Sequence, residues 1–469
     1  MNRNSKKAEN KDKIDNTGIA KDLMTSRAGL TLFSRYLDKL GIWEPVVRLF
    51  GGIRKNRKGA SAQEIFKQAF MFFADGTSRH LAYFDELQKD LGYAAAIETA
   101  AGRLISSHGM KRAFRAFGPI RVFKFRELLQ KLFVWRLNID NPLVIELFLD
   151  TMVMDNDDAE HRGGVSPTYK NVKGFQPLQL IWNGFVIDAV FRGGRRHSNY
   201  SDHVEKMLRH VVAQIRKGHR ADVPIIVRSD SGFFDQKLFE LCRSLGIGFS
   251  TSGKMYEDIK TFGASCPPES WTAYSNGASD WEYAEFGNRR ASWKIGHHRA
   301  FYLRLAREET GQGILEFARP DTVVYTNLGM GQAVDSLLRA AGQDGLMAPE
   351  EVIRLHHLKG KGELAHRGFK EFRDERMPFK QFLANAAFYY MALTSFFLFE
   401  AFKIDVAVPV VLPGAYPNTV RRKLVDIAGK IVRHGGKTIL KVAQSVWDGL
   451  GWAELWRRSG TPPLFVWAR

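Results

Sequence analysis

The sequence predicts an α/β protein: a helical N-terminal region, then a mixed sheet with flanking helices that is interrupted by a β-rich segment. Three observations support this prediction. Residues 21–135 carry apolar side chains at three- and four-residue spacing, as in LTLFSRYLDKL, which is typical of amphipathic helices. From residue 136 onward, continuous apolar runs such as LVIELFLD indicate buried strands. Between residues 255 and 320, short alternating runs such as DWEYAEF indicate antiparallel strands.

The N-terminal part of the chain divides into a tail and a helical region. Residues 1–20 are polar and basic, and we expect them to be flexible. In the helical region 21–135, a short predicted helix crowds Lys111, Arg112 and Arg115 within about one turn. Short helices with a basic member are typical of helix-turn-helix-like DNA-binding modules. A helical bundle with an ordinary solvated face fits the pattern equally well.

The predicted sheet begins in residues 136–254 and continues in residues 321–403. The order is a strand, a hairpin around Asn183-Gly184, a helix, a strand, a helix and a strand, which favours a mixed sheet with helices on its faces. The run Phe382 to Phe402 is long enough to span a membrane. No second span accompanies it, so a buried helix packed on the sheet is favoured. Residues 404–469 form a basic C-terminal region that includes Arg421, Arg422 and Lys423.

Composition narrows the class of protein. The net charge is +19, with 69 Lys and Arg spread over most of the chain, which favours a polyanion such as nucleic acid as partner. The two cysteines, Cys242 and Cys266, exclude a disulfide framework and a cysteine zinc site, and they fit a reducing cytoplasm. The polar N-terminus excludes a signal peptide.

Three carboxylates lie at positions that are typical of metal-ion binding sites. Asp150 and Asp230 each end an apolar strand-like run, and Glu363 lies in a later segment that reads as helical. Two carboxylates at strand ends and a third from a helix can bind a pair of Mg²⁺ ions for phosphoryl transfer. Taken singly, either aspartate fits a turn or helix cap equally well.

The spacing around Glu363 is the most specific signal. His356, Lys359, Glu363 and Lys370 would share one stripe if the whole segment were helical, although Gly360 and Gly362 suggest that the helix begins near Lys361. Such a stripe suits a metal carboxylate flanked by phosphate contacts. An exposed charged helix is the alternative.

With these motifs the chain resembles the DDE transposases of bacterial insertion sequences, in the group with a Tyr-x2-Arg-x3-Glu-x6-Lys signature. Here the signature reads His356-x2-Lys359-x3-Glu363-x6-Lys370. The segments LDTMV and GGVSPTYKNVKGFQPL resemble the first-aspartate motif of the group, and IIVRSDSGFFD resembles the second. The long interval between Asp230 and Glu363 accommodates the β-rich insertion that this group carries.

The resemblance implies a ribonuclease-H-like core, two Mg²⁺ ions that Mn²⁺ can replace, and catalysis by Asp150, Asp230 and Glu363. It implies cut-and-paste movement of an insertion sequence, which has terminal inverted repeats, into target DNA. It also implies that a homodimer pairs the two ends and that the protein is located at the bacterial nucleoid. His356, Lys359 and Lys370 are then expected to contact DNA phosphates. The basic groups at 111–115 and 421–423 are expected to bind the ends. A catalytically inactive DNA-binding regulator and a metal-dependent nuclease without strand transfer are the alternatives.

The β-rich insertion also holds Trp271, Trp281 and Trp293. We expect them to fill a small core. The alternative is that one of them stacks on a base drawn out of the duplex near the cleavage site.

Overall fold

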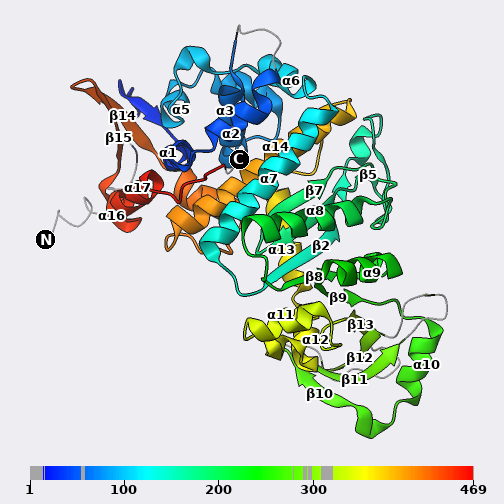
Figure 1. Ribbon diagram of the computed structural model, residues 1–469. Coiled ribbons are helices and arrows are strands. Elements are labelled where there is room, and N and C mark those ends of the chain that lie inside the picture. Colours follow the sequence, from blue (N-terminus) through cyan, green and yellow to red (C-terminus); the bar gives the residue numbers. More distant parts are fainter. Residues whose placement is uncertain are drawn as a thin grey trace, which may run out of the picture.

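A mixed sheet runs from the middle of the molecule to the end away from the N-terminal helices (Figure 1). The computed structural model describes residues 14, 16–53, 59–277, 279–288, 293, 298–307 and 321–467, with the backbone alone at 359–361. Nine strands of the described chain form the sheet. In spatial order they are β10 (Thr272–Ser275), β11 (Asp280–Asn288), β12 (His298–Arg307), β13 (Thr322–Thr326), β9 (Gly248–Ser252), β8 (Ile225–Ser229), β2 (Ile145–Thr151), β6 (Leu178–Trp182) and β7 (Phe185–Val190).

The centre of this sheet is parallel and both sides are antiparallel. Strand β8 runs parallel to β2 and to β9, whereas β6 and β7 form the hairpin predicted at Asn183-Gly184. Parallel strands need crossover connections, and helices α8 (His203–Gly218) and α9 (Gln236–Leu245) supply them here. The mixed α/β class predicted from the apolar runs is therefore confirmed.

The region of residues 21–135 is mostly helical. Its helices are α1 (Leu30–Leu40), α2 (Trp43–Phe50), α3 (Ala62–Asp75), α4 (Phe84–Leu87), α5 (Leu91–Ala96), α6 (Ser107–Arg115) and α7 (Pro119–Asp140). Helix α3 begins with a capping box, in which the Ser61 hydroxyl accepts from Glu64 N–H and the Glu64 carboxylate accepts from Ser61 N–H.

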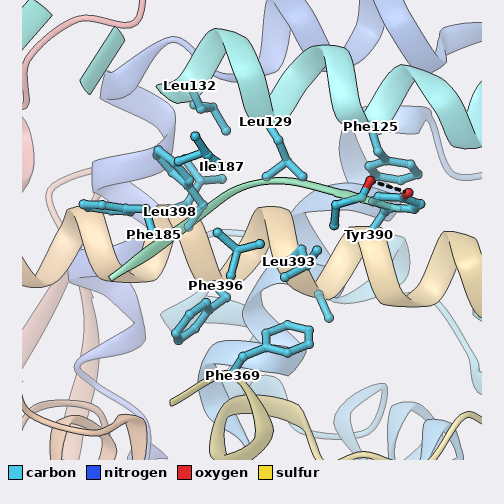
Figure 2. Packing of buried hydrophobic residues seen from close by; sticks show 14 of the residues in the cluster. Phe125, Leu129, Leu132, Phe185, Ile187, Phe369, Tyr390, Leu393, Phe396 and Leu398 are labelled. Carbon is cyan, nitrogen blue, oxygen red and sulfur yellow. Dashed lines mark hydrogen bonds between the residues drawn. The ribbon is translucent and has the colours of Figure 1, made fainter. Parts of the chain in front are cut away.

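Helix α14 (Phe382–Phe402) joins the helical region to the sheet. It packs on α3, α6 and α7 and also on β7 and α13 (Lys359–Arg373). Figure 2 shows apolar packing on both sides of α14: Phe125 of α7 lies against Tyr390 on one side, and Phe396 faces Phe369 of α13 on the other. The segment Phe382–Ala407 is the one described helix long and apolar enough to cross a membrane, but 89% of its most apolar window is buried inside the protein. This packing agrees with the predicted buried helix.

The β-rich segment contains the antiparallel strands that its texture suggests, and they join the main sheet. Strands β10, β11 and β12 continue the main sheet through β13, which pairs antiparallel with β9. A helix, α10 (Glu257–Ser265), opens the segment, where strands were expected. Sheet edges add further strands readily because their backbone groups are unpaired, and alternation alone does not reveal which edge a strand joins.

The three insertion tryptophans pack inside the protein. Trp271 lies under the guanidinium of Arg304 at 3.7 Å, Trp281 lies 4.9 Å from the ring of His357, and Trp293 lies 5.0 Å from the ring of Phe234. All three are partly buried against apolar clusters, which favours the core interpretation over base stacking.

The remaining elements surround these two parts. The basic C-terminal region is structured: β14 and β15 form a hairpin that pairs with the N-terminal β1. The elements are β1 (Leu23–Thr25), β3 (Met154–Asp155), β4 (Ser166–Pro167), β5 (Lys173–Phe175), α11 (Ala333–Ala340), α12 (Pro349–His357), α15 (Pro417–Val420), β14 (Gly429–His434), β15 (Lys437–Val442), α16 (Gln444–Gly449) and α17 (Trp452–Gly460).

Candidate active site

Asp150 and Asp230 lie side by side at the carboxyl-terminal ends of two neighbouring central strands, β2 and β8. Leu149 of β2 is the register partner of Ser229 of β8, so the next residue on each strand is an aspartate. Adjacent strands lie about 4.8 Å apart, which brings the two carboxylates close together. Asp150 Oδ1 accepts from Thr151 N–H at 2.6 Å, and Asp230 Oδ1 accepts from Gly232 N–H at 2.9 Å. Each carboxylate is thereby oriented by its own backbone.

Glu363 reaches these strand ends because α13 approaches β2 very closely at Gly362. A Cβ built on Gly362 would lie 2.0 Å from Cδ1 of the Phe148 ring, where real Cβ contacts essentially never fall below 3.0 Å. Only a glycine therefore fits this contact without displacement. Phe148 precedes Asp150 by two residues, so both side chains project from the same face of β2. The exposed side chain of Glu363 follows Gly362 directly.

The three acids share one electrostatic environment. Burial, and then the negative charges of Asp230 and Glu363, raise the pKa of Asp150 to about 7. Within the described residues, however, no group of three or more His, Cys, Asp or Glu side chains is arranged to hold a metal ion. Like charges repel, and a bound divalent cation would offset the repulsion among these acids. Carboxylate oxygens are the ligands that Mg²⁺ prefers, and this donor set therefore fits Mg²⁺.

His366 lies beside Asp150, three residues after Glu363 on α13. Its Nδ1 is 3.5 Å from Asp150 Oδ2, and its side chain is 11% exposed. Burial, and then the charges of Lys370 and Lys170, lower the pKa of His366 to about 4, so the imidazole is neutral at neutral pH. Sequence reasoning missed His366. Its position three residues after Glu363, on the same helical face, is the signal that could have found it.

Tyr169 and Lys170 border the site from the turn between β4 and β5. Thr168 N–H donates to Val172 O at 2.9 Å and closes this turn. Burial, and then the charges of Asp150, Asp230 and Glu363, raise the pKa of Tyr169 above its ordinary value, which places its hydroxyl near the acids. The Tyr169 side chain is nevertheless largely exposed, so it lies on the open side of the site.

The predicted cation stripe is divided between two helices. Helix α12 ends at His357 and α13 starts at Lys359, so His356 does not share a helix with Glu363. His356 is also 4% exposed, which corrects the prediction that it contacts DNA, because a phosphate cannot reach it. The side chain of Lys359 lies outside the described residues. Lys370 is half-buried and pairs with Glu375 at 3.0 Å.

The predicted DNA-binding cations on other elements differ in exposure. On α6, Arg112 and Arg115 are exposed and Lys111 is partly exposed. Arg422 and Lys423 are exposed as well.

Arg421 is buried, which corrects the prediction that it grips DNA. Its guanidinium donates to the backbone carbonyls of four residues and to the Asn418 side chain. The carbonyls belong to Phe73, Ala74, Glu371 and Phe372. Arg421 therefore ties the end of α3 to the end of α13.

A cavity of about 400 Å³ adjoins the contact between Phe148 and Gly362, and Arg228 also lines it. Arg228 is buried, donates to Leu355 O at 3.2 Å and lies 3.5 Å from Glu146. Its bonding is therefore internal, and it is not available to clamp a phosphate.

Comparison with known proteins adds family information. A family described as transposase DDE domain group 1 matches residues 7–451. No curated protein matches the chain. Among solved structures, a piggyBac transposase synaptic complex with hairpin DNA is similar at 11% identity, with a TM-score of 0.35. That alignment covers 87% of this chain and 83% of the other.

Proposed function

The chain belongs to the transposase DDE domain family, group 1, and we propose that it is an active transposase that cuts and joins DNA at Asp150, Asp230 and Glu363. In the proposed reaction, the element is cut at its terminal inverted repeats and its ends are transferred to target DNA. The five strands β7-β6-β2-β8-β9 are then the ribonuclease-H-like core, and β10–β12 are its insertion.

One observation supports this proposal above the others. Two aspartates leave adjacent parallel strands at the same sheet edge, and Gly362 allows a helix close enough to add Glu363. Burial raises the pKa of Asp150 most, and the negative charges of Asp230 and Glu363, gathered where a divalent cation would be bound, raise it further. A structural role alone does not explain mutually repelling acids at an accessible edge.

The side chains divide the work of phosphoryl transfer. Asp150, Asp230 and Glu363 would hold two Mg²⁺ ions, which supply a stronger nucleophile and stabilise the leaving oxygen. Lys370 lies seven residues after Glu363 on the same helix and would contact a phosphate of the cleaved strand, in exchange for its pairing with Glu375. No covalent protein intermediate is required, because positioning and charge stabilisation suffice.

DNA binding would use cations away from the acids. Lys111, Arg112 and Arg115 of α6 are available to contact the inverted repeat, whereas Arg422 and Lys423 are available to phosphates. Base contacts discriminate between sequences and phosphate contacts do not, so the two groups are separable by experiment. Joining two ends requires that both be held together, and we propose that a homodimer does this.

The test uses charge-removing variants that keep local hydrogen bonds. Asp150→Asn, Asp230→Asn and Glu363→Gln are compared with Glu205→Gln, an exposed control on α8. The substrate is a duplex with the inverted repeat found in the DNA that flanks the gene. Losing several kcal/mol of charge stabilisation should slow Mg²⁺-dependent cleavage by about 100-fold or more, while end binding in a gel shift is retained.

The other outcomes distinguish the alternatives. End binding without cleavage by the unmodified protein would identify a regulator. Cleavage without joining would identify a nuclease. Full activity of any of the three acid variants would remove that residue from the proposed site.

A further inference from the structure

His366 connects the helix that carries Glu363 to the strand that carries Asp150. Of the two oxygens of Asp150, Oδ1 accepts from Thr151 N–H, and Oδ2 faces Nδ1 of His366 at 3.5 Å. The strand thus orients one oxygen and α13 contacts the other. His366 Nε2 is buried and has no hydrogen-bond partner among the described residues, so Nδ1 is the nitrogen whose contact matters.

Helix α13 contacts β2 at two points: Gly362 meets Phe148, and His366 meets Asp150. The distance between the two points along the helix matches the distance between them along the strand. Gly362 and His366 are four residues apart on α13, which is about 6 Å along a helix. Their partners Phe148 and Asp150 are two residues apart on β2, which is about 6.6 Å along a strand. The two contact points are therefore nearly as far apart on the helix as they are on the strand. Glu363 lies between these points, so its position depends on both.

We propose that His366 is a positioning residue, and this proposal rests on the proposed function. His366 fixes the Asp150 carboxylate and thereby the register of α13 on β2. The register of α13 in turn sets the position of Glu363. The contact between Phe148 and Gly362 is a van der Waals contact without a hydrogen bond or an ion pair. A contact of that kind resists approach and does not resist sliding. The polar contact between Nδ1 and Oδ2 at 3.5 Å is a second point of attachment, and it restrains sliding because it joins α13 to a residue two positions further along β2.

The test compares three replacements of His366. In His366→Asn the amide nitrogen lies as many bonds from Cα as Nδ1 does, so it can still reach Asp150. In His366→Gln the nitrogen corresponds to Nε2, and His366→Leu has no donor. His161→Asn, at an exposed position, is the control. Cleavage rate, direct Mn²⁺ affinity by calorimetry and the thermal midpoint are measured for each protein.

The expected result is rescue by asparagine alone. Groups that orient metal ligands typically contribute about 10–100-fold in affinity or activity, so Gln and Leu should lose about that much in both Mn²⁺ affinity and rate. Asn should lose much less at a similar thermal midpoint. Equal losses for all three variants, or losses that follow the thermal midpoint, would assign His366 to packing and overturn the proposal.

A second measurement needs no DNA and separates this proposal from the proposed function. The denaturation midpoint of the metal-free protein is measured for His366→Leu, Asp150→Ala and the double variant. Non-additive shifts are expected, because residues in contact are coupled. Additive shifts would show that the two side chains do not interact and would refute the positioning role even if cleavage is observed. A coupled pair in a protein that never cleaves DNA would instead count against the transposase activity.

Discussion

Replacing Gly362 with alanine tests whether the close approach of α13 to β2 sets the position of Glu363. The added Cβ would lie 2.0 Å from Phe148 Cδ1, whereas ordinary van der Waals contact begins at 3.4 Å. Either α13 retreats to restore an ordinary contact or the ring turns. Displacement of a catalytic group by about 1 Å can cost about 100-fold in rate, and that is the expected loss of cleavage.

The expected change in stability is smaller than the change in rate. Overpacking costs about 1–3 kcal/mol, and replacing a helical glycine with alanine returns up to about 1 kcal/mol. The free energy of unfolding should therefore fall by about 0–3 kcal/mol, less than the total stability of an ordinary folded protein. Gly368→Ala on the same helix is the matched control, because the nearest atom to its Cβ would be Phe396 Cζ at 3.3 Å.

A double-mutant cycle identifies the cause of the lost activity. Phe148→Ala removes the ring atoms that collide, so Gly362→Ala should cost little further activity in that background. The assay is Mg²⁺-dependent cleavage of the inverted-repeat duplex, with urea denaturation to check folding. Full activity of Gly362→Ala alone would refute the reasoning. It would mean that the ring swings into the adjoining cavity while α13 stays in place.

Three further predictions follow from the burial and charge of named side chains. Folding raises the pKa of Asp150 to about 7, so the protonated carboxyl is favoured in the folded state. The metal-free protein should therefore lose up to about 4 kcal/mol of unfolding free energy as pH rises from about 4 to about 7. In urea titrations, Asp150→Asn should abolish this loss. Arg421→Met should cost at least about 3 kcal/mol in the same assay, because it leaves buried carbonyls unpaired, whereas Arg422→Met should stay within about 0.5 kcal/mol. In gel shifts, Arg112→Glu should reduce discrimination between the true end and random DNA, and Lys423→Glu should weaken both alike; the opposite pattern would exchange the two surfaces.

The two strand-end aspartates were predictable because strand-end position is a local property. An apolar run that stops at Asp150 or Asp230 indicates both a buried strand and its end. The parallel pairing of these two strands was not predictable in the same way, because the β6–β7 hairpin and α8 both lie between them in the sequence.

The rest of the site was not predictable because it depends on contacts between distant segments. Gly360 and Gly362 indicated a helix that begins near Lys361, and α13 begins at Lys359, but the glycines did not indicate which strand that helix approaches. The glycine at 362 was interpreted as a weak point of a helix, although its reason is the ring of Phe148, which lies far earlier in the sequence. The burial of Arg421 is likewise set by carbonyls at the ends of two other helices, which no local pattern encodes.

The packing of α14 also sets an order of events during synthesis. The N-terminal helices α3, α6 and α7 are made first, but the helix that covers their apolar faces ends at Phe402. At about 5–20 residues per second, the ribosome needs roughly 13–50 seconds to go from the end of α7 to the end of α14. Throughout that time the nascent chain exposes the apolar faces of α3, α6 and α7 that α14 later covers, although Phe50, Phe66 and Phe125 already pack on one another within this region. A chain that stops before α14 would therefore be a substrate for chaperones and proteases, and it would not be a smaller DNA-binding protein.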